Sequence, residues 1–276
     1  SGVYRIGNGQ TRAKRTYAVR AGSRPVSLAY APGGMIVFGE YFDNAERGEM
    51  HVYGSNDQGR TWNPVHTFPT GSIRHIHGIT YDPYLDCFWI ATGDVGNENM
   101  VLRADSEFSD VQIVREGGQG NRFYSFLVDN DNLITATDTP LESNFISVID
   151  KSDGALTEVQ AIENSNFYSC RVGDRYFVST NAEPPEANDI DQSHLWMSGE
   201  DYRQWGRVAS YPVDWLAKLD RLRVIPPGLF QFSRIFFPEG TNDSSTLVVH
   251  AIGLRGLSNH MICYTIDEFT EDRVGN

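Results

Sequence analysis

Apolar and polar residues alternate along this chain in many short runs, and residues that favour turns separate the runs. Alternation with a period of two is typical of β-strands that bury one face. The clearest set consists of four successive runs at residues 25–30, 35–40, 49–54 and 64–68. We therefore predict an all-β chain of short strands with little helix.

The same order of four strands recurs about five times. Further sets lie at 76–81, 87–92, 100–103 and 111–114; at 124–128, 133–137, 145–149 and 156–161; and at 168–172, 176–180, 194–198 and 207–211. The last set, at 232–237, 247–252 and 260–266, lacks a clear fourth strand. Repeated four-stranded sheets that bury their faces against one another are the units of a β-propeller. We predict one β-propeller domain over residues 1–276, with five blades of four antiparallel strands; a six-bladed ring is the alternative.

Four stretches lie outside this period. We expect residues 15–19 to supply the missing outer strand of the fifth blade and so close the ring through both termini. In the six-bladed alternative, residues 3–6 add a further strand. Residues 214–222 have the apolar spacing of one helical face and predict a short helix. Residues 182–192 predict an acidic, proline-containing loop of a length that is often functional.

Composition narrows the classes of partner. The net charge is −13, which disfavours nucleic acid and anionic membrane surfaces. No apolar run is long enough to span a bilayer, so we expect a soluble protein with no membrane partner. The three cysteines lie far apart in apolar runs, and we predict buried free thiols. The compartment stays open, with a secreted or periplasmic location favoured over the cytoplasm.

The octapeptide SNDQGRTW at residues 55–62 is the most specific motif in the chain. It predicts a hairpin turn in which Gly59 has a positive φ, Ser55 and Asp57 accept hydrogen bonds from backbone N–H groups, and Trp62 packs against the sheet. A degenerate copy occupies residues 198–205, and residues 152–157 carry a fainter one.

This motif matches the Asp box, and the chain resembles the sialidase-like superfamily of β-propellers. The segment around Arg24 and the strand ending at Glu40 are similar to the opening of a sialidase, and Arg24 matches one of the arginines that bind the sialate carboxylate. Asp43 or Glu46 stands near the position of the acid/base aspartate. The other sialidase arginines and the Tyr-Glu nucleophile pair have no match by motif. The resemblance therefore implies a β-propeller fold and a protein that is related to the sialidases but is not a true sialidase.

Ligands of propellers usually bind at one mouth of the central channel, where loops lead into the first strand of each blade and out of the second. Arginine, histidine, tyrosine and carboxylate side chains gather at these positions. The predicted catalytic residues are Asp94, Asp138, His75 and Tyr124. The predicted substrate-binding residues are Arg24, Glu40, Arg74, His77, Arg122, Tyr168, Glu183 and Arg255. A channel mouth is also polar simply because water fills it.

Arginines bind carboxylates or sulfates, tyrosines stack on sugar rings, and paired carboxylates cleave glycosidic bonds. We therefore predict a carbohydrate-active propeller that acts on a glycan or polysaccharide as a glycoside hydrolase. A non-catalytic glycan-binding or scaffold propeller is the first alternative. The second is a polysaccharide lyase, in which a tyrosine or histidine removes a proton and Arg122 neutralises a uronate.

His75 and His77 are two residues apart, so both rings lie on one side of a strand. His250 from the fifth blade is a candidate third member. A hydrogen-bonded or general-base histidine is the commoner role of an isolated pair, so we predict no metal and no other cofactor; a metal centre is the alternative. Asp94 and Asp138 each follow a second strand, where an aspartate either does acid/base work or caps a turn.

Overall fold

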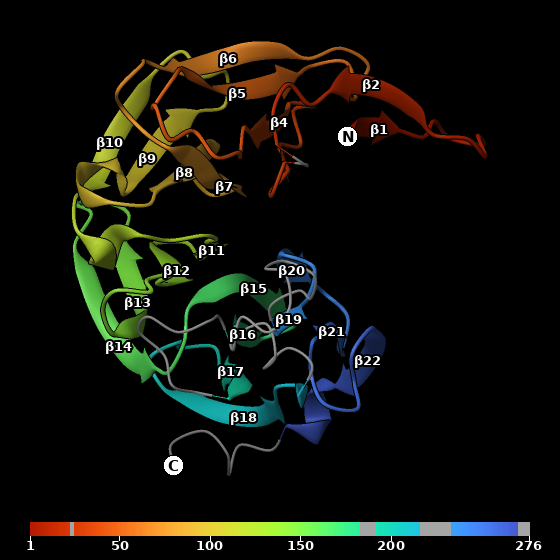
Figure 1. Cartoon of the computed structure of the whole chain (residues 1–276), viewed down its shortest axis with the longest axis vertical. Helices are drawn as coiled ribbons and strands as arrows, with labels where there is room; N and C mark the ends of the chain where they lie inside the picture. Colours follow the sequence, from red (N-terminus) through yellow and green to blue (C-terminus); the bar gives the residue numbers. More distant parts are fainter. Residues whose placement is uncertain (23–24, 183–190, 216–232, 270–276) are drawn as a thin grey trace. The chain divides into compact units, whose positions relative to one another are not determined.

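The computed structural model describes residues 1–22, 25–182, 191–215 and 233–269 (Figure 1). The chain divides into two compact units, residues 1–123 and 124–276. That residues 1–276 form a single domain stays a prediction. The helix expected at 214–222 lies outside the described residues from 216 onward, as do Arg24 and Glu183.

The first unit contains two four-stranded antiparallel sheets in the predicted strand order. The first sheet consists of β3 (Ala29–Tyr30), β4 (Ile36–Gly39), β5 (Met50–Ser55) and β6 (Asn63–Phe68). The second consists of β7 (His75–Asp82), β8 (Cys87–Gly93), β9 (Met100–Asp105) and β10 (Val111–Glu116). Both sheets contribute to one buried apolar cluster that includes Val37, Ile76 and Phe88. This packing fixes β7 and β8, the two strands that lead to the candidate site.

The two N-terminal strands pair with each other, which the sequence did not predict. β1 (Gly2–Arg5) and β2 (Lys14–Ala18) form their own two-stranded antiparallel sheet. That residues 15–19 also supply the outer strand of the last blade stays a prediction. A hairpin between strands so near in sequence costs little loop-closure entropy, and strand alternation alone does not reveal its partner.

The second unit contains three sheets. β11 (Leu127–Val128), β12 (Asn132–Ala136), β13 (Asn144–Asp150) and β14 (Leu156–Ile162) form one of four strands. β15 (Asn166–Val172), β16 (Arg175–Thr180), β17 (Gln192–Ser198) and β18 (Trp205–Pro212) form the next, and β20 (Gly240–Asn242) adds a parallel strand beside β15. β19 (Arg234–Phe236), β21 (Thr246–Ile252) and β22 (His260–Thr265) form the third. The predicted all-β class is confirmed, whereas the number of blades stays a prediction.

A shared irregularity shows that four of these sheets repeat one design. In each, the fourth strand carries one extra residue opposite the third, and this extra residue is a valine: Val65, Val114, Val159 and Val208. Such a bulge increases the local twist of an edge strand and blunts it against pairing with another chain. These four sheets therefore share the bulge as well as the strand order that the sequence predicted.

The turn at residues 55–62 has the predicted geometry. Gly59 has a φ of 76°, and its backbone N–H donates to Ser55 Oγ at 2.8 Å. Asp57 Oδ1 accepts hydrogen bonds from the backbone N–H groups of Arg60 and Thr61, both at 2.9 Å. These hydrogen bonds hold the pKa of Asp57 well below its usual range. The motif thus acts as a hairpin turn.

The cysteines follow the prediction only in part. All three are free thiols, and Cys87 and Cys170 are buried, but Cys263 is exposed. Cys263 lies on β22, where exposure alternates along the strand, and it falls on the outward face. No helix among the described residues is long and apolar enough to cross a membrane.

Candidate functional site

The β7–β8 hairpin places two histidines and an aspartate at one end of its sheet. His75 is the first residue of β7 and pairs with Gly93, the last residue of β8. Asp94 follows Gly93 directly. The register with β8 skips His77, because Ile76 pairs with Thr92 and Gly78 with Ala91. His77 is therefore the extra residue of a β-bulge, a device that re-aims side chains near functional sites.

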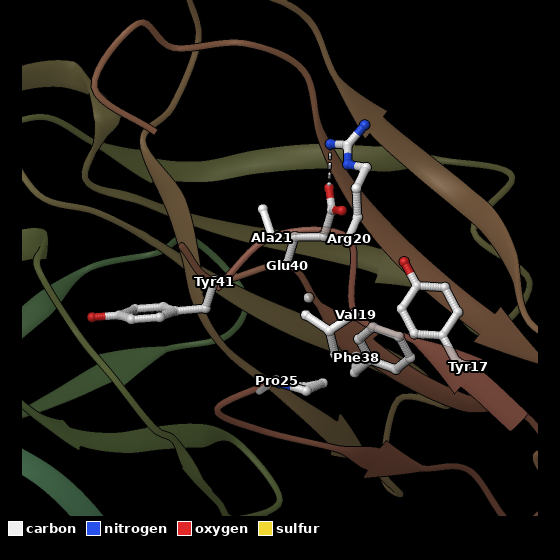
Figure 2. A pocket seen from close by; sticks show the side chains of 9 residues that line it. Tyr17, Val19, Arg20, Ala21, Pro25, Phe38, Glu40 and Tyr41 are labelled. Atoms are coloured by element: carbon white, nitrogen blue, oxygen red, sulfur yellow. Dashed lines mark hydrogen bonds and ion pairs between the residues drawn. The ribbon is translucent and has the colours of Figure 1, made fainter. Parts of the chain in front are cut away.

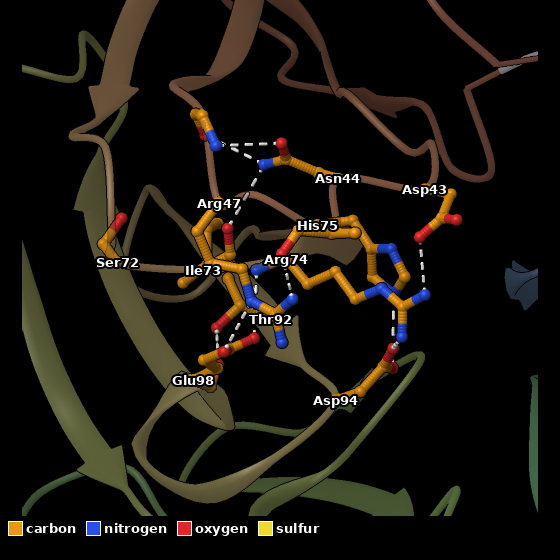
Figure 3. Close-up of polar contacts among 12 residues, drawn as sticks. Asp43, Asn44, Arg47, Ser72, Ile73, Arg74, His75, Thr92, Asp94 and Glu98 are labelled. Atoms are coloured by element: carbon orange, nitrogen blue, oxygen red, sulfur yellow. Dashed lines mark hydrogen bonds and ion pairs between the residues drawn. The ribbon is translucent and has the colours of Figure 1, made fainter.

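The carboxylate of Asp94 is the centre of this cluster, and Figure 3 shows Arg74 reaching it. Its Oδ1 atom lies 3.2 Å from Nε2 of His75 and 3.1 Å from Nε2 of His77. Arg122 Nη2 lies 3.2 Å from the same oxygen, and Arg74 Nη1 lies 3.2 Å from Oδ2. Four side chains that carry or can carry positive charge therefore surround one carboxylate.

Arg74 joins this carboxylate to a second one. Its Nη2 atom lies 2.6 Å from Oδ1 of Asp43, as Figure 3 shows. The side chain of Asp43 is 75% exposed, whereas that of Asp94 is only 13% exposed. The hydrogen bond to Asp43 raises the pKa of Arg74, so the guanidinium stays charged. One arginine thus holds a solvent-facing carboxylate beside a largely buried one.

Each histidine is also fixed through its other ring nitrogen. Nδ1 of His75 lies 3.2 Å from the carbonyl oxygen of Phe42, and Nδ1 of His77 lies 2.9 Å from that of Phe123. Tyr41 stacks on His75 with ring centroids 4.3 Å apart. The carbonyls and the stacked ring set the orientation of the imidazoles.

The loop that carries Asp94 is held by polar contacts. Gln119 Nε2 donates to the backbone carbonyl of Asp94 at 2.9 Å. Glu98, in the 3₁₀ segment η1 (Gly96–Glu98), accepts hydrogen bonds from Arg47 Nε at 2.8 Å and from the backbone N–H of Arg74 at 3.1 Å. The sequence did not single out Glu98, Arg47 or Gln119. The dense polar composition of residues 94–99 was the available signal for Glu98.

The electrostatics of the cluster favour a charged Asp94. Burial acts to raise the pKa of this carboxyl, but its interactions with His75 and His77 outweigh it, so the pKa lies well below its usual range. Burial lowers the pKa of His77, and Asp94 offsets this only in part. Asp94 is therefore an anion at neutral pH and has no proton to donate.

The structure gathers five of the predicted residues here: Arg74, His75, His77, Asp94 and Arg122. Glu40 has other partners. Its Oε2 atom pairs with Arg20 at 3.3 Å and accepts the backbone N–H of His51 at 2.9 Å. Figure 2 shows this pair beside a cavity of only about 10 Å³, which suits a single water and not a sugar.

Four of the remaining predicted residues are described in the second unit. Tyr124 is buried and stacks on Phe167 at 4.9 Å, and Asp138 is buried. Tyr168 packs against Phe236 at 4.7 Å, and Arg255 is exposed. Their roles in binding or catalysis stay predictions. Arg24 and Glu183 lie outside the described residues.

Comparison with known proteins identifies the fold. No protein-family model matches the chain, and no curated protein sequence matches it. Among solved structures, it is similar to the GH74 xyloglucanase of Xanthomonas campestris, with a TM-score of 0.57 and 13% identity over 88% of this chain. It is also similar to a chain of the nidogen/laminin complex, with a TM-score of 0.55 and 11% identity over 96% of this chain and 87% of that one. A GH74 enzyme of Niastella koreensis gives a TM-score of 0.51 at 16% identity over 72% of this chain.

These structural neighbours are β-propeller proteins, so the predicted propeller fold is confirmed. The chain spans only 38% and 33% of the two GH74 enzymes. At these identities the likeness establishes the fold and leaves the activity to be argued from the site.

Proposed function

We propose that this protein is a carbohydrate-active β-propeller that binds a glycan over the Asp94 cluster and hydrolyses a glycosidic bond there. The observation that supports the proposal best is the bridge through Arg74, which holds Asp43 and Asp94 together. Two carboxylates in different surroundings are what glycoside hydrolysis requires.

The two carboxylates have different environments, and we assign them different roles. Asp94 is an anion beside the guanidinium groups of Arg74 and Arg122, so it acts as the charged partner, a base or a nucleophile. Asp43 faces solvent and makes its ion pair through only one oxygen of the carboxylate. It is the more accessible of the two carboxylates, so we assign it the position that faces the glycosidic oxygen. We propose Asp43 as the partner of Asp94 because Arg74 contacts both carboxylates. A catalytic role for Asp138 stays a prediction.

The arginines define the class of glycan. Arg74 and Arg122 present guanidinium groups whose side chains are 34% and 16% exposed. Guanidinium groups recognise carboxylates and sulfates in a bidentate manner. We therefore propose an acidic polysaccharide as the substrate, with Tyr41 supplying an aromatic ring at the edge of the site.

The test is a turnover assay on a panel of acidic and neutral polysaccharides, with new reducing ends as the readout. We expect turnover by the wild type and losses of at least about 100-fold in Asp43→Asn and Asp94→Asn, the scale on which general acid/base groups act. Glu107→Gln is the matched control, because Glu107 is an exposed carboxylate in the turn at the opposite end of the same sheet.

The outcomes separate the three functions. An unsaturated product that absorbs in the ultraviolet would replace hydrolysis by a lyase reaction. Glycan binding without any product would leave a binding propeller. Full turnover in both aspartate variants would show that the reaction does not use this cluster.

A further inference from the structure

Beyond the proposed reaction, we propose that His75, His77 and Asp94 form a binding site for a divalent transition-metal ion. Their ligand atoms, one from each side chain, all lie within 4.8 Å of one another. The inference rests on how these three groups face each other and is independent of any glycan.

The tautomer of each histidine is set by the main chain. A backbone carbonyl can only accept a hydrogen bond, so the carbonyls of Phe42 and Phe123 place the proton of each neutral ring on Nδ1. The unprotonated Nε2 atoms then both face Oδ1 of Asp94. Three potential ligand atoms then lie close together, and a positive charge between them makes that arrangement favourable.

Burial restricts the source of that charge. His77 is 1% exposed, and His75 is 6% exposed. Two buried imidazolium ions 5.1 Å apart between ring centroids, with Arg74 and Arg122 beside them, would put four cations around one carboxylate. Burying these four cations away from water has a large desolvation cost. A bound metal ion supplies the charge while both rings stay neutral.

Two of the three ligand separations are close to those around such an ion. Ligands about 2.1 Å from a tetrahedral zinc ion are roughly 3.4 Å apart. The separations between Nε2 and Oδ1 are 3.2 Å for His75 and 3.1 Å for His77. A carbonyl that accepts from the distal nitrogen of a ligating histidine is also the usual outer partner in metal sites. Arg74, paired with Oδ2, orients the carboxylate so that Oδ1 faces the histidines.

The donor set indicates the kind of metal. Two imidazoles and one carboxylate favour zinc and its neighbours in the first transition row over calcium or magnesium. Three protein ligands leave at least one position for water or an exogenous ligand. Asp43 and Asp94 balance Arg74 and Arg122, so a dication adds two positive charges that an anionic ligand would offset. Arg122 is expected to release Oδ1 when the metal binds.

The site is tested by titrating the full chain, without an affinity tag and after chelation, with Co²⁺. We expect one equivalent to bind with visible d–d absorption and Zn²⁺ to displace it. His77→Ala and Asp94→Asn should weaken the affinity by at least about 100-fold, more than the loss of an outer partner causes. His51→Gln is the matched control, because His51 lies on β5 and its Nδ1 is hydrogen-bonded to Thr67.

The wild-type titration decides the matter even if a variant fails to fold, which circular dichroism detects. Stoichiometric binding with the absorption of imidazole-bound Co²⁺ supports the site. Absence of a one-to-one complex in the wild type, or unchanged affinity in folded His77→Ala and Asp94→Asn, overturns it. Because the readout is spectroscopic, a failed glycan assay does not affect this result, and a missing metal leaves the hydrolase proposal standing.

Discussion

Replacing Asp82 by alanine should destabilise the hairpin that carries the site. Asp82 ends β7 and has no exposed surface, and its Oδ2 atom accepts the indole N–H of Trp89 at 2.9 Å. Its Oδ1 atom accepts the backbone N–H groups of Tyr84 and Leu85 at 2.9 and 3.2 Å. The carboxylate therefore caps the β7–β8 turn and satisfies a fully buried indole at once.

The magnitude follows from which partners water can replace. The side chains of Tyr84 and Leu85 are about half exposed, so water can reach this turn. Trp89 is fully buried, and leaving its N–H without an acceptor costs about 1–3 kcal/mol. When the lost hydrogen bonds to a charged group are added, we expect Asp82→Ala to lower the free energy of unfolding by about 2–4 kcal/mol. At roughly 2–4 °C per kcal/mol, the melting temperature should fall by roughly 4 to 16 °C.

The assay is thermal unfolding followed by circular dichroism. Glu107→Gln is the control, because Glu107 lies in another turn of the same sheet and is exposed. It should change the stability by less than about 0.5 kcal/mol. In a double-mutant cycle with Trp89→Phe, the coupling should be about 1–3 kcal/mol, as for residues in direct contact. A coupling near zero would refute this account of Asp82.

Three further outcomes are expected. Gly93→Ala should keep the fold but lose Co²⁺ binding, because a Cβ there would lie 2.7 Å from Cε1 of His77, and a normal Co²⁺ titration would contradict this. Asp57 has a folded pKa below its unfolded value, so its stabilisation is present above about pH 4 and is lost as the pH falls further. The difference in melting temperature between wild type and Asp57→Asn should therefore shrink from pH 5 to pH 2, and a constant difference would argue otherwise. Cys263 should react with a thiol reagent in the native protein, whereas buried Cys170, whose pKa burial raises, should react only after unfolding. More than one reactive thiol per native chain would contradict the burial.

The strand order could be predicted from the sequence because each run alternates and each set ends in turn residues. The partners of the terminal strands could not, since alternation shows which face is buried and not which strand lies alongside. Residues 15–19 illustrate this limit, because they form the expected strand but pair with Gly2–Arg5.

Strand positions predicted which residues gather at the candidate site, but they did not predict all of the hydrogen-bond partners. Arg74, His75 and Asp94 stand at the ends of adjacent strands, so strand positions alone bring them together. The acceptors for the histidine Nδ1 atoms are main-chain carbonyls of Phe42 and Phe123, which no residue type reveals. The partner of Glu40 is Arg20, which comes from an irregular segment before the first sheet.

The bulge at His77 has a consequence for tracing this site through other propellers. Ile76 and Ile79 both belong to the buried cluster, yet they are three residues apart, and a regular strand would bury residues separated by an even number. A related blade that lost one residue between them would keep both isoleucines in its core while losing a metal ligand. Folding and metal binding can thus be inherited separately. The count of residues between two core positions becomes a marker, legible in a sequence alone, of which relatives carry the site.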